Sequence, residues 1–141
     1  MNNSRKPTIT EIDQLTAYLP ILYADGFNPV KVWYGGRQKD ETIQMPYPEY
    51  DEVVTDFFHL VAKDYWMDYE YVPENARQSL ENEEAIKSAS LGEIKTMLTY
   101  CVRGERFCVG HWESMIVNGY VRRILERLID LRQQMGENTE V

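Results

Sequence analysis

Cysteine and long apolar runs are both scarce in this sequence. The 141 residues include two cysteines, Cys101 and Cys108, too few for the disulfide framework of a small secreted protein. No window approaches the roughly 20 apolar residues that span a bilayer, and the opening MNNSRKPTIT lacks the apolar run of a signal peptide. We therefore expect a cytoplasmic protein with no membrane contact.

Positive charge is also in deficit, with 15 Lys and Arg against 23 Asp and Glu and a net charge of −8. A field of this sign disfavours non-specific binding to phosphate backbones. The deficit is uneven, because residues 101–135 hold six arginines, no lysine and four acids. If the chain has an anionic partner, this last third is where we expect it to bind.

The remaining composition is that of one globular domain, with 43% hydrophobic and 27% charged residues and no visible repeat or linker. We predict a single helical domain over residues 8–134. A flexible N-terminus, residues 1–7, and a flexible acidic tail, residues 135–141, are expected to flank it.

Apolar residues recur at three- and four-residue steps in several segments, as amphipathic helices require. The first segment, residues 9–24, contains Pro20, which predicts a break near Leu19. Capping-box patterns begin this helix at Thr8 and a later helix at Ser90.

The widest apolar stripe predicts a final helix, in which Gly119 either separates two helices or interrupts one. Such a stripe must be buried, against its own domain or against a second copy, so a homo-oligomer through this helix is one expectation. The stripe comprises Val117, Val121, Ile124, Leu128, Leu131 and Met135.

Two short extended pieces, Val30–Tyr34 and Thr42–Met45, surround a polar loop with glycines and predict a hairpin. The prolines of the next segment, PYPEY, suit the first turn of the helix that follows. Together these patterns predict a mainly α fold: one compact helical domain of about five helices with a minor two-stranded hairpin.

The stretch VRGERFCVGHWESMIVNGYV, residues 102–121, predicts a corner between two helices. The helix that begins at Ser90 should run to about Gly104, and Gly110 is an acceptable N-cap for the next one. ERFCV then forms the connection, with Phe107 and Trp112 expected to be buried beneath it.

At this point the chain resembles a small bacterial family of uncharacterised domains. The resemblance rests on QMPYPEY and on LTYCVRGERFCVGHW, which match an MPYP-x-Y motif and an RGERFC-x-GHW motif. It covers roughly residues 30–130 and implies a compact bacterial domain, but no activity. Val109 stands where a small acidic residue is common in the family.

The corner also holds the residues of a possible thiol site. Cys108 and His111 could form a thiolate–imidazolium pair, since a nucleophilic cysteine needs a base or a positive neighbour. The alternative is a cysteine that packs as a small apolar side chain. Zinc ligation by Cys101, Cys108 and His111 lacks a fourth ligand, because the other histidine, His59, lies in a distant helix, and we expect no metal or other cofactor.

Arg103 and Arg106 with Glu105 could instead clamp an anion, since arginine grips carboxylate or phosphate with two parallel bonds. Trp112 and the aromatic residues Tyr47 and Tyr50 of MPYPEY would then complete a ligand site. The interpretation we favour is that these arginines bind the protein's own acids or the carbonyls at helix ends. The candidate acids are Glu113 and those in residues 64–84. The same segment contains Trp66, Tyr69 and Tyr71, which could line a pocket or an interface.

Nucleic-acid binding through the C-terminal helices is a further hypothesis, but the arginines there alternate with acids, as on a solvated helix face. The function we predict is a non-enzymatic cytoplasmic binding or protein-interaction domain, with an unknown protein or a small anionic ligand as partner. A small enzyme using Cys108 and His111 is the alternative. A nucleic-acid-associated regulator is a third hypothesis, and a disfavoured one. The arginines in question are Arg122, Arg123, Arg127 and Arg132.

Overall fold

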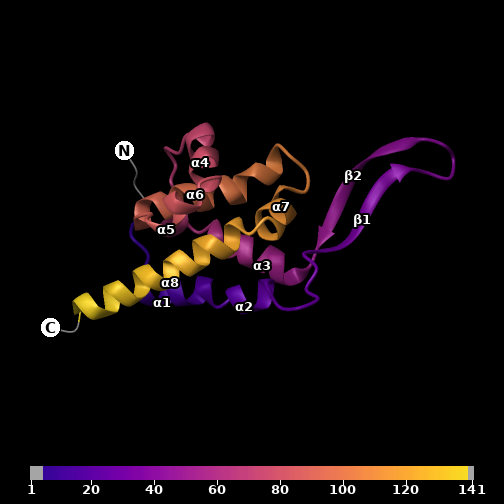
Figure 1. Cartoon of the computed structure of the whole chain (residues 1–141). Coiled ribbons are helices and arrows are strands. Elements are labelled where there is room, and N and C mark those ends of the chain that lie inside the picture. The colour runs from indigo at the N-terminus through magenta and orange to yellow at the C-terminus, as the bar shows by residue number, and fades with distance from the viewer. Residues whose placement is uncertain (1–4, 140–141) are drawn as a thin grey trace.

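The computed structural model of the chain describes residues 5–139, and the side chains of residues 5–136. A helical body carries a long antiparallel ribbon that projects from one end (Figure 1). In chain order the elements are α1 (Ile9–Thr16), α2 (Leu19–Leu22), β1 (Val30–Arg37), β2 (Ile43–Tyr50), α3 (Glu52–Val61), α4 (Pro73–Leu80), α5 (Glu83–Lys87), α6 (Leu91–Arg103), α7 (His111–Val117) and α8 (Tyr120–Thr139), with short 3-10 turns at η1 (Asp64–Trp66) and η2 (Gly104–Arg106).

The mainly α fold with a minor hairpin is confirmed, but the predicted number of helices was wrong. Over the described residues there are eight helical segments, or seven when the single turn α2 is counted with α1. The extra helices, α4 and α5, lie in a polar stretch where the apolar period is short. The break that Pro20 predicts is present, because α1 ends at Thr16 and α2 begins at Leu19.

The final helix organises the body, since α8 packs against α1, α5, α6 and α7. Its apolar stripe is buried within the same chain: Val121, Ile124, Leu125 and Leu128 have no exposed surface. Burial of the stripe therefore needs no second copy, and self-association stays a prediction. The helix runs to Thr139, past the domain end that we placed at residue 134, while residues 140–141 lie outside the described part.

Both expected capping boxes are present, with Thr8 and Ser90 accepting from the third backbone N–H of their helices. Before the first of them, Arg5 pairs with Glu11 at 2.6 Å. The Nζ of Lys95 donates to the Arg5 carbonyl at 3.1 Å. Residue 5 therefore lies against the body, and residues 1–4 of the predicted flexible N-terminus lie outside the described residues.

The hairpin is longer than predicted, and its prolines are in a strand rather than a helix. Pro48 pairs opposite Trp33, and Pro46 lies where the ladder is irregular. The prediction that they open the next helix was wrong: α3 begins at Glu52, with Asp51 as its N-cap. Proline is tolerated here because a two-stranded ribbon offers free edges and irregular positions where no N–H is needed.

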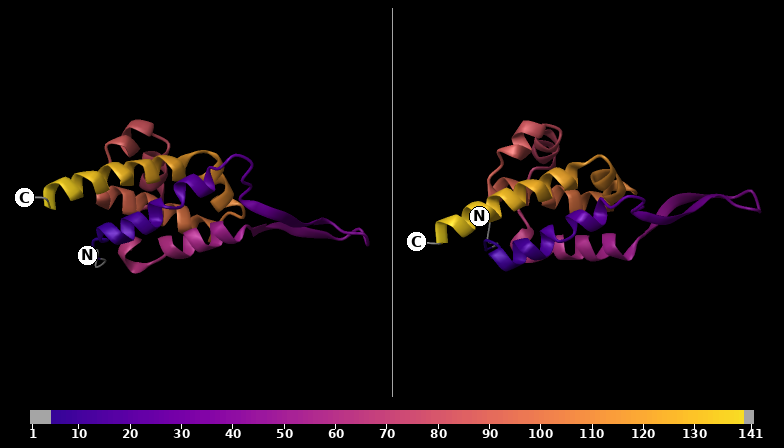
Figure 2. Two further views of the ribbon diagram at one scale, coloured as in Figure 1. Left: turned by 90° about the horizontal axis from the view of Figure 1, so that it is seen from below. Right: turned by 60° about the horizontal axis from the view of Figure 1, so that its bottom comes forward.

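The ribbon, residues 30–50, extends away from the helices beyond its base (Figure 2). No other helix or strand runs beside its outer part in any of the views of Figures 1 and 2. Within residues 5–139, no helix combines the length and apolar character needed to cross a bilayer.

Gly119 separates the last two helices, which resolves the alternative left open by the sequence. It has a φ of +85°, and a Cβ there would meet only ordinary contacts, the nearest at 3.6 Å from an Arg123 nitrogen. Val117, which we placed in the apolar stripe of the final helix, is the last residue of α7 and is 64% exposed. It is therefore not part of the buried stripe of α8.

We expect Gly119→Ala to lower the free energy of unfolding by about 1–2 kcal/mol, because only the left-handed backbone is strained. Gly92→Ala, in the first turn of α6, should raise it by about 0.5–1 kcal/mol, since the backbone there is helical and the nearest contact is 3.9 Å. Urea denaturation of both variants measures the two signs. Equal effects would contradict the assignment of Gly119 as a helix terminator.

Candidate functional site

The predicted corner, residues 103–112, is confirmed as the connection between α6 and α7. Helix α6 ends at Arg103, the turn η2 covers Gly104–Arg106, and α7 begins at His111. A Cβ at position 104 would lie 2.3 Å from Nε2 of His111, so only glycine allows the ring to approach this closely. The corner is therefore tightly closed around the imidazole.

Glu105 is the residue that holds the corner together. Its Oε2 accepts from the backbone N–H of Gly110 at 3.0 Å, and its Oε1 accepts from that of Trp112 at 2.8 Å. The same Oε1 accepts from the hydroxyl of Tyr50 at 2.8 Å. Gly110, the N-cap of α7, has no side chain that could cap the helix. The Glu105 carboxylate, five and seven residues earlier in the chain, instead accepts from the N–H groups of Gly110 and Trp112.

Trp112 is one of the two aromatic residues that we expected beneath the corner, and it is found there. It stacks on Phe58 with ring centres 4.6 Å apart, and its Nε1 donates to the Val102 carbonyl at 3.0 Å. The expectation for Phe107 was wrong, because its side chain is 82% exposed. An aromatic residue in a five-residue turn can face either way, and the sequence pattern does not distinguish the two.

The ribbon stands on this corner. Tyr50, the last residue of β2, bonds to Glu105 and packs against Trp112 with ring centres 5.3 Å apart. Burial and the bond to Glu105 raise the pKa of the Tyr50 hydroxyl. From β1, the ring of Trp33 lies against Gly110, where a Cβ would be 3.2 Å from it.

Tyr47, which we grouped with the corner residues, lies further out along the ribbon. It stacks on Tyr34 with ring centres 5.3 Å apart and is half exposed. The structure therefore brings Tyr50, Glu105 and Trp112 together and leaves Tyr47 apart from them. These three side chains join the base of the ribbon to the corner.

The prediction that Arg103 and Arg106 pair with acids of the protein was wrong. Within the described part of the chain, neither Arg103 nor Arg106 makes an ion pair with Glu113, with the acids of residues 64–84 or with any other acid. Arg103 does reach the predicted segment, but its Cζ lies over the rings of Tyr69 and Tyr71 at 5.7 and 5.6 Å. Arg106 lies over Phe107 at 5.9 Å.

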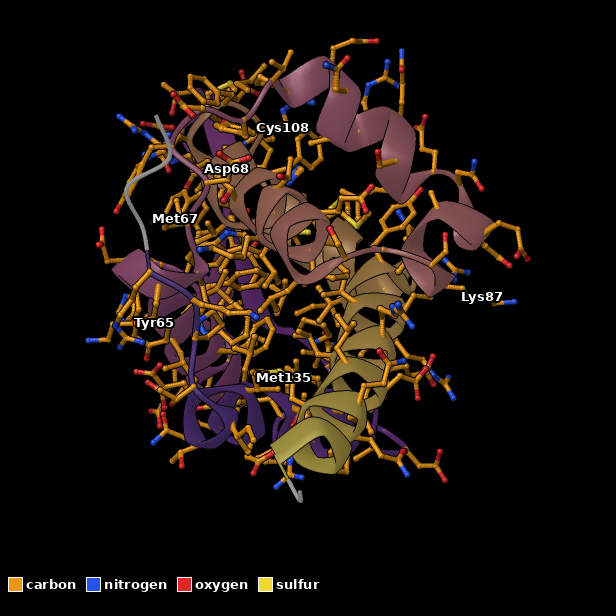
Figure 3. All side chains as sticks on the ribbon, turned by 90° about the vertical axis from the view of Figure 1, so that its left-hand side faces the viewer. Tyr65, Met67, Asp68, Lys87, Cys108 and Met135 are labelled. Carbon is orange, nitrogen blue, oxygen red and sulfur yellow. The ribbon has the colours of Figure 1, made fainter. Side chains whose placement is uncertain are left out.

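Cys108 and His111 lie at one pocket but are not hydrogen-bonded to each other. The imidazole is nearly buried, its Nε2 lies 3.2 Å from the Tyr100 carbonyl oxygen, and burial lowers its pKa. Because a carbonyl only accepts, Nε2 donates this bond and carries the proton. Cys108 is exposed on the upper side of the body in Figure 3, away from Met135 in α8.

Cys101, the third residue of the zinc hypothesis, is fully buried in α6, and burial raises the pKa of its thiol to about 12. Across residues 5–139 no three Cys, His, Asp or Glu side chains are grouped so that they could hold a metal ion. Trp66, a predicted pocket residue, is likewise fully buried in the core.

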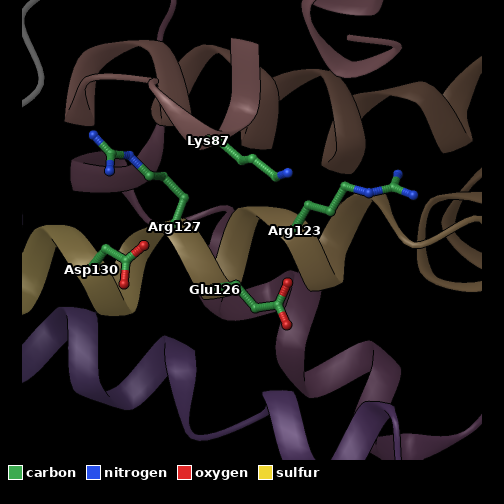
Figure 4. Close-up of a pocket in the computed structure, with 5 residues that line it drawn as sticks. All are labelled: Lys87, Arg123, Glu126, Arg127 and Asp130. Atoms are coloured by element: carbon green, nitrogen blue, oxygen red, sulfur yellow. The ribbon is translucent and has the colours of Figure 1, made fainter. Parts of the chain in front are cut away.

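The arginines of α8 are bonded within the chain. A hollow of about 460 Å³ is lined by Arg123 and Arg127, which point in opposite directions (Figure 4). Arg123 pairs with Glu83 at 3.1 Å, and Nε of Arg127 donates to the Ala89 carbonyl at 2.9 Å. Further pairs join Arg122 to Glu126 at 3.4 Å and Arg132 to Asp13 at 3.1 Å.

The hairpin was predicted from the sequence, but the exposure of its apolar side chains was not. Its exposed apolar residues come from both strands, and nothing in their alternation reveals that the hairpin leaves the body. The doublet Gly35-Gly36 and the two prolines were the available signals of an irregular, free-standing ladder. These exposed residues are Val32, Trp33, Tyr34, Ile43, Met45 and Tyr47.

We expect Glu105→Ala to lower the free energy of unfolding by about 2–3 kcal/mol, because it leaves two backbone donors and a hydroxyl without their acceptor. Tyr50→Phe removes one of these bonds and should cost about 1 kcal/mol. Glu84→Ala, at an exposed acid of α5, is the matched control and should stay within about 0.5 kcal/mol of wild type. Chemical denaturation measures all three, and a Glu105→Ala variant as stable as the control would contradict this role.

Comparison with known proteins gives one family. A model described as a family of unknown function, DUF6508, matches residues 7–134, close to the domain limits predicted from the sequence. No curated protein and no solved structure gives a significant match. The expected membership of an uncharacterised domain family is confirmed, and the chain belongs to the family of unknown function DUF6508.

Proposed function

We propose that this chain is a non-enzymatic binding domain that recognises an extended segment of a partner protein along the ribbon. The observation that carries the proposal is the exposure of large apolar side chains on a projecting ladder. Ile43 and Met45 are 82% and 81% exposed, and Trp33 and Tyr34 are about half as exposed. A surface where several large apolar side chains are exposed, in contrast to single scattered ones, is typical of protein-interaction sites.

The free edge of β1 is the edge that fits strand addition. Trp33 and Pro48 are directly opposite, and Pro48 has no N–H to exchange, so theirs is a pair without ladder bonds. The N–H and C=O of Trp33 must then face the outer edge of β1. On the outer edge of β2, Pro48 has no N–H to donate. A partner strand can therefore pair with both the N–H and the C=O groups only along the edge of β1.

Charge favours an acidic partner. Residues 30–39 contain Lys31, Arg37 and Lys39 and no acid, in a chain with a net charge of −8. Lys31 and Arg37 are held only by long pairs, at 3.6 Å to Glu52 and 4.0 Å to Glu41. Such pairs are weak, so both cations are available to acids on an added strand.

The anchoring at the corner supports the same proposal. A two-stranded hairpin is marginal by itself, and this one is held at its base by Tyr50 on Glu105 and by Trp33 on Gly110. A strand edge fixed in advance costs less conformational entropy when a partner binds.

Two expectations remain proposals beside this one. A cytoplasmic location fits two cysteines that are both unpaired. Self-association through α8 would have to use its outer surface, where Ile129 is 43% exposed, because Leu128 lies in the core.

The test uses a short synthetic peptide that alternates glutamate with valine, and its lysine counterpart, in isothermal titration calorimetry. We expect the acidic peptide to bind and the basic one not to bind. Lys31→Glu with Arg37→Glu should weaken binding about tenfold, since two attractions become repulsions. Lys63→Glu with Lys87→Glu makes the same charge change away from the ribbon and should have little effect.

A second matched pair tests the edge itself. Trp33→Ala and Trp33→Pro both lose the indole, but only the proline loses the outward N–H, so we expect the proline variant to bind more weakly. Equal binding by both would contradict strand addition at β1. Binding of duplex DNA in place of the peptide would overturn the proposal of a protein partner.

A further inference from the structure

The corner also borders a pocket whose lining includes no residue of the ribbon. A pocket of about 230 Å³ lies between the segment before α4, the end of α6 and the turn that leads into α7. Its walls are mainly aromatic and apolar, and Tyr71, Tyr100, Phe107, Gly104, Cys108 and His111 are among the residues that line it. None of the contacts that fix the ribbon uses these walls.

The polar groups of the pocket floor are already engaged or neutral. Nε2 of His111 donates to the Tyr100 carbonyl, and burial lowers the imidazole pKa, which favours the neutral form. The imidazole and Tyr100 rings meet edge to face at 5.1 Å. The interior therefore suits a flat apolar or aromatic body more than a polar one.

Two arginines that form no ion pair among the described residues lie over rings at this pocket. Arg103 precedes Gly104 of the wall, and its guanidinium is held over the rings of Tyr71, which lines the pocket, and Tyr69. Arg106 lies over Phe107, another lining residue. Stacking on an aromatic ring leaves the N–H edge of a guanidinium able to bind a carboxylate.

We propose that this pocket binds a small molecule with an aromatic or apolar body and one carboxylate, and that Arg103 is the counter-ion of that carboxylate. The body enters between Tyr71, Tyr100 and His111, while the charged end stays at the rim. The site is separate from the strand edge of β1, because none of its lining residues belongs to the ribbon.

The probe is benzoate, compared with benzyl alcohol, which has a similar ring and no charge. Titration of the full chain is followed by ¹H–¹⁵N correlation spectra. Benzoate should shift the amides of Gly104, Cys108 and His111 and bind about tenfold more tightly than benzyl alcohol, because a charge-assisted bond is roughly twice as strong as a neutral one. Arg103→Gln should remove this preference and leave the affinity for benzyl alcohol unchanged.

Two controls separate the pocket from the surface in general. Arg37→Gln, at an exposed arginine of the ribbon, should keep the preference for benzoate. Cys108→Trp places a large side chain in the pocket and should abolish binding of both probes, whereas Val109→Trp, at an exposed neighbour outside the lining, should not. Unchanged benzoate binding in Arg103→Gln, or amide shifts scattered away from the corner, would overturn the proposal.

Discussion

The carboxylate of Glu105 joins the start of α7 to the end of the ribbon. Helix α7 begins at His111, and its N-cap, Gly110, has no side chain that could cap it, so Glu105 from the preceding turn accepts from the N–H groups of Gly110 and Trp112. The same carboxylate receives the hydroxyl of Tyr50, which lies 55 residues earlier. A group that closes a helix end and also fastens a strand couples the corner to the ribbon, because both contacts use the same side chain.

This coupling explains why two different surfaces meet at a single corner. On one side the ribbon leaves the body with its apolar side chains exposed, supported by Tyr50 and Trp33. On the other side α6 ends in Arg103, whose guanidinium stacks on tyrosines beside a small pocket. Glu105 accepts its bonds from Tyr50, Gly110 and Trp112, and neither Arg103 nor Arg106 has an acidic partner among the described residues.

The sequence predicted the position of the corner better than its chemistry. Capping boxes, glycines and the break at Pro20 are local signals, and they located helix ends correctly. The partner of a charged side chain is a tertiary property, so the arginines were paired with acids that they do not contact. Burial of Phe107 and the helical assignment of Pro48 failed for the same reason: exposure and strand pairing depend on residues distant in the chain.

Backbone amide hydrogen exchange at Trp112 and Gly110 tests the central claim most directly. First-turn amides of a helix ordinarily lack a partner and exchange quickly. We expect both amides to be protected in the wild type, and we expect Glu105→Ala to remove this protection while the interior of α6 keeps its own. Fast exchange at both amides in the wild type would show that Glu105 does not hold the corner, and the account would be contradicted.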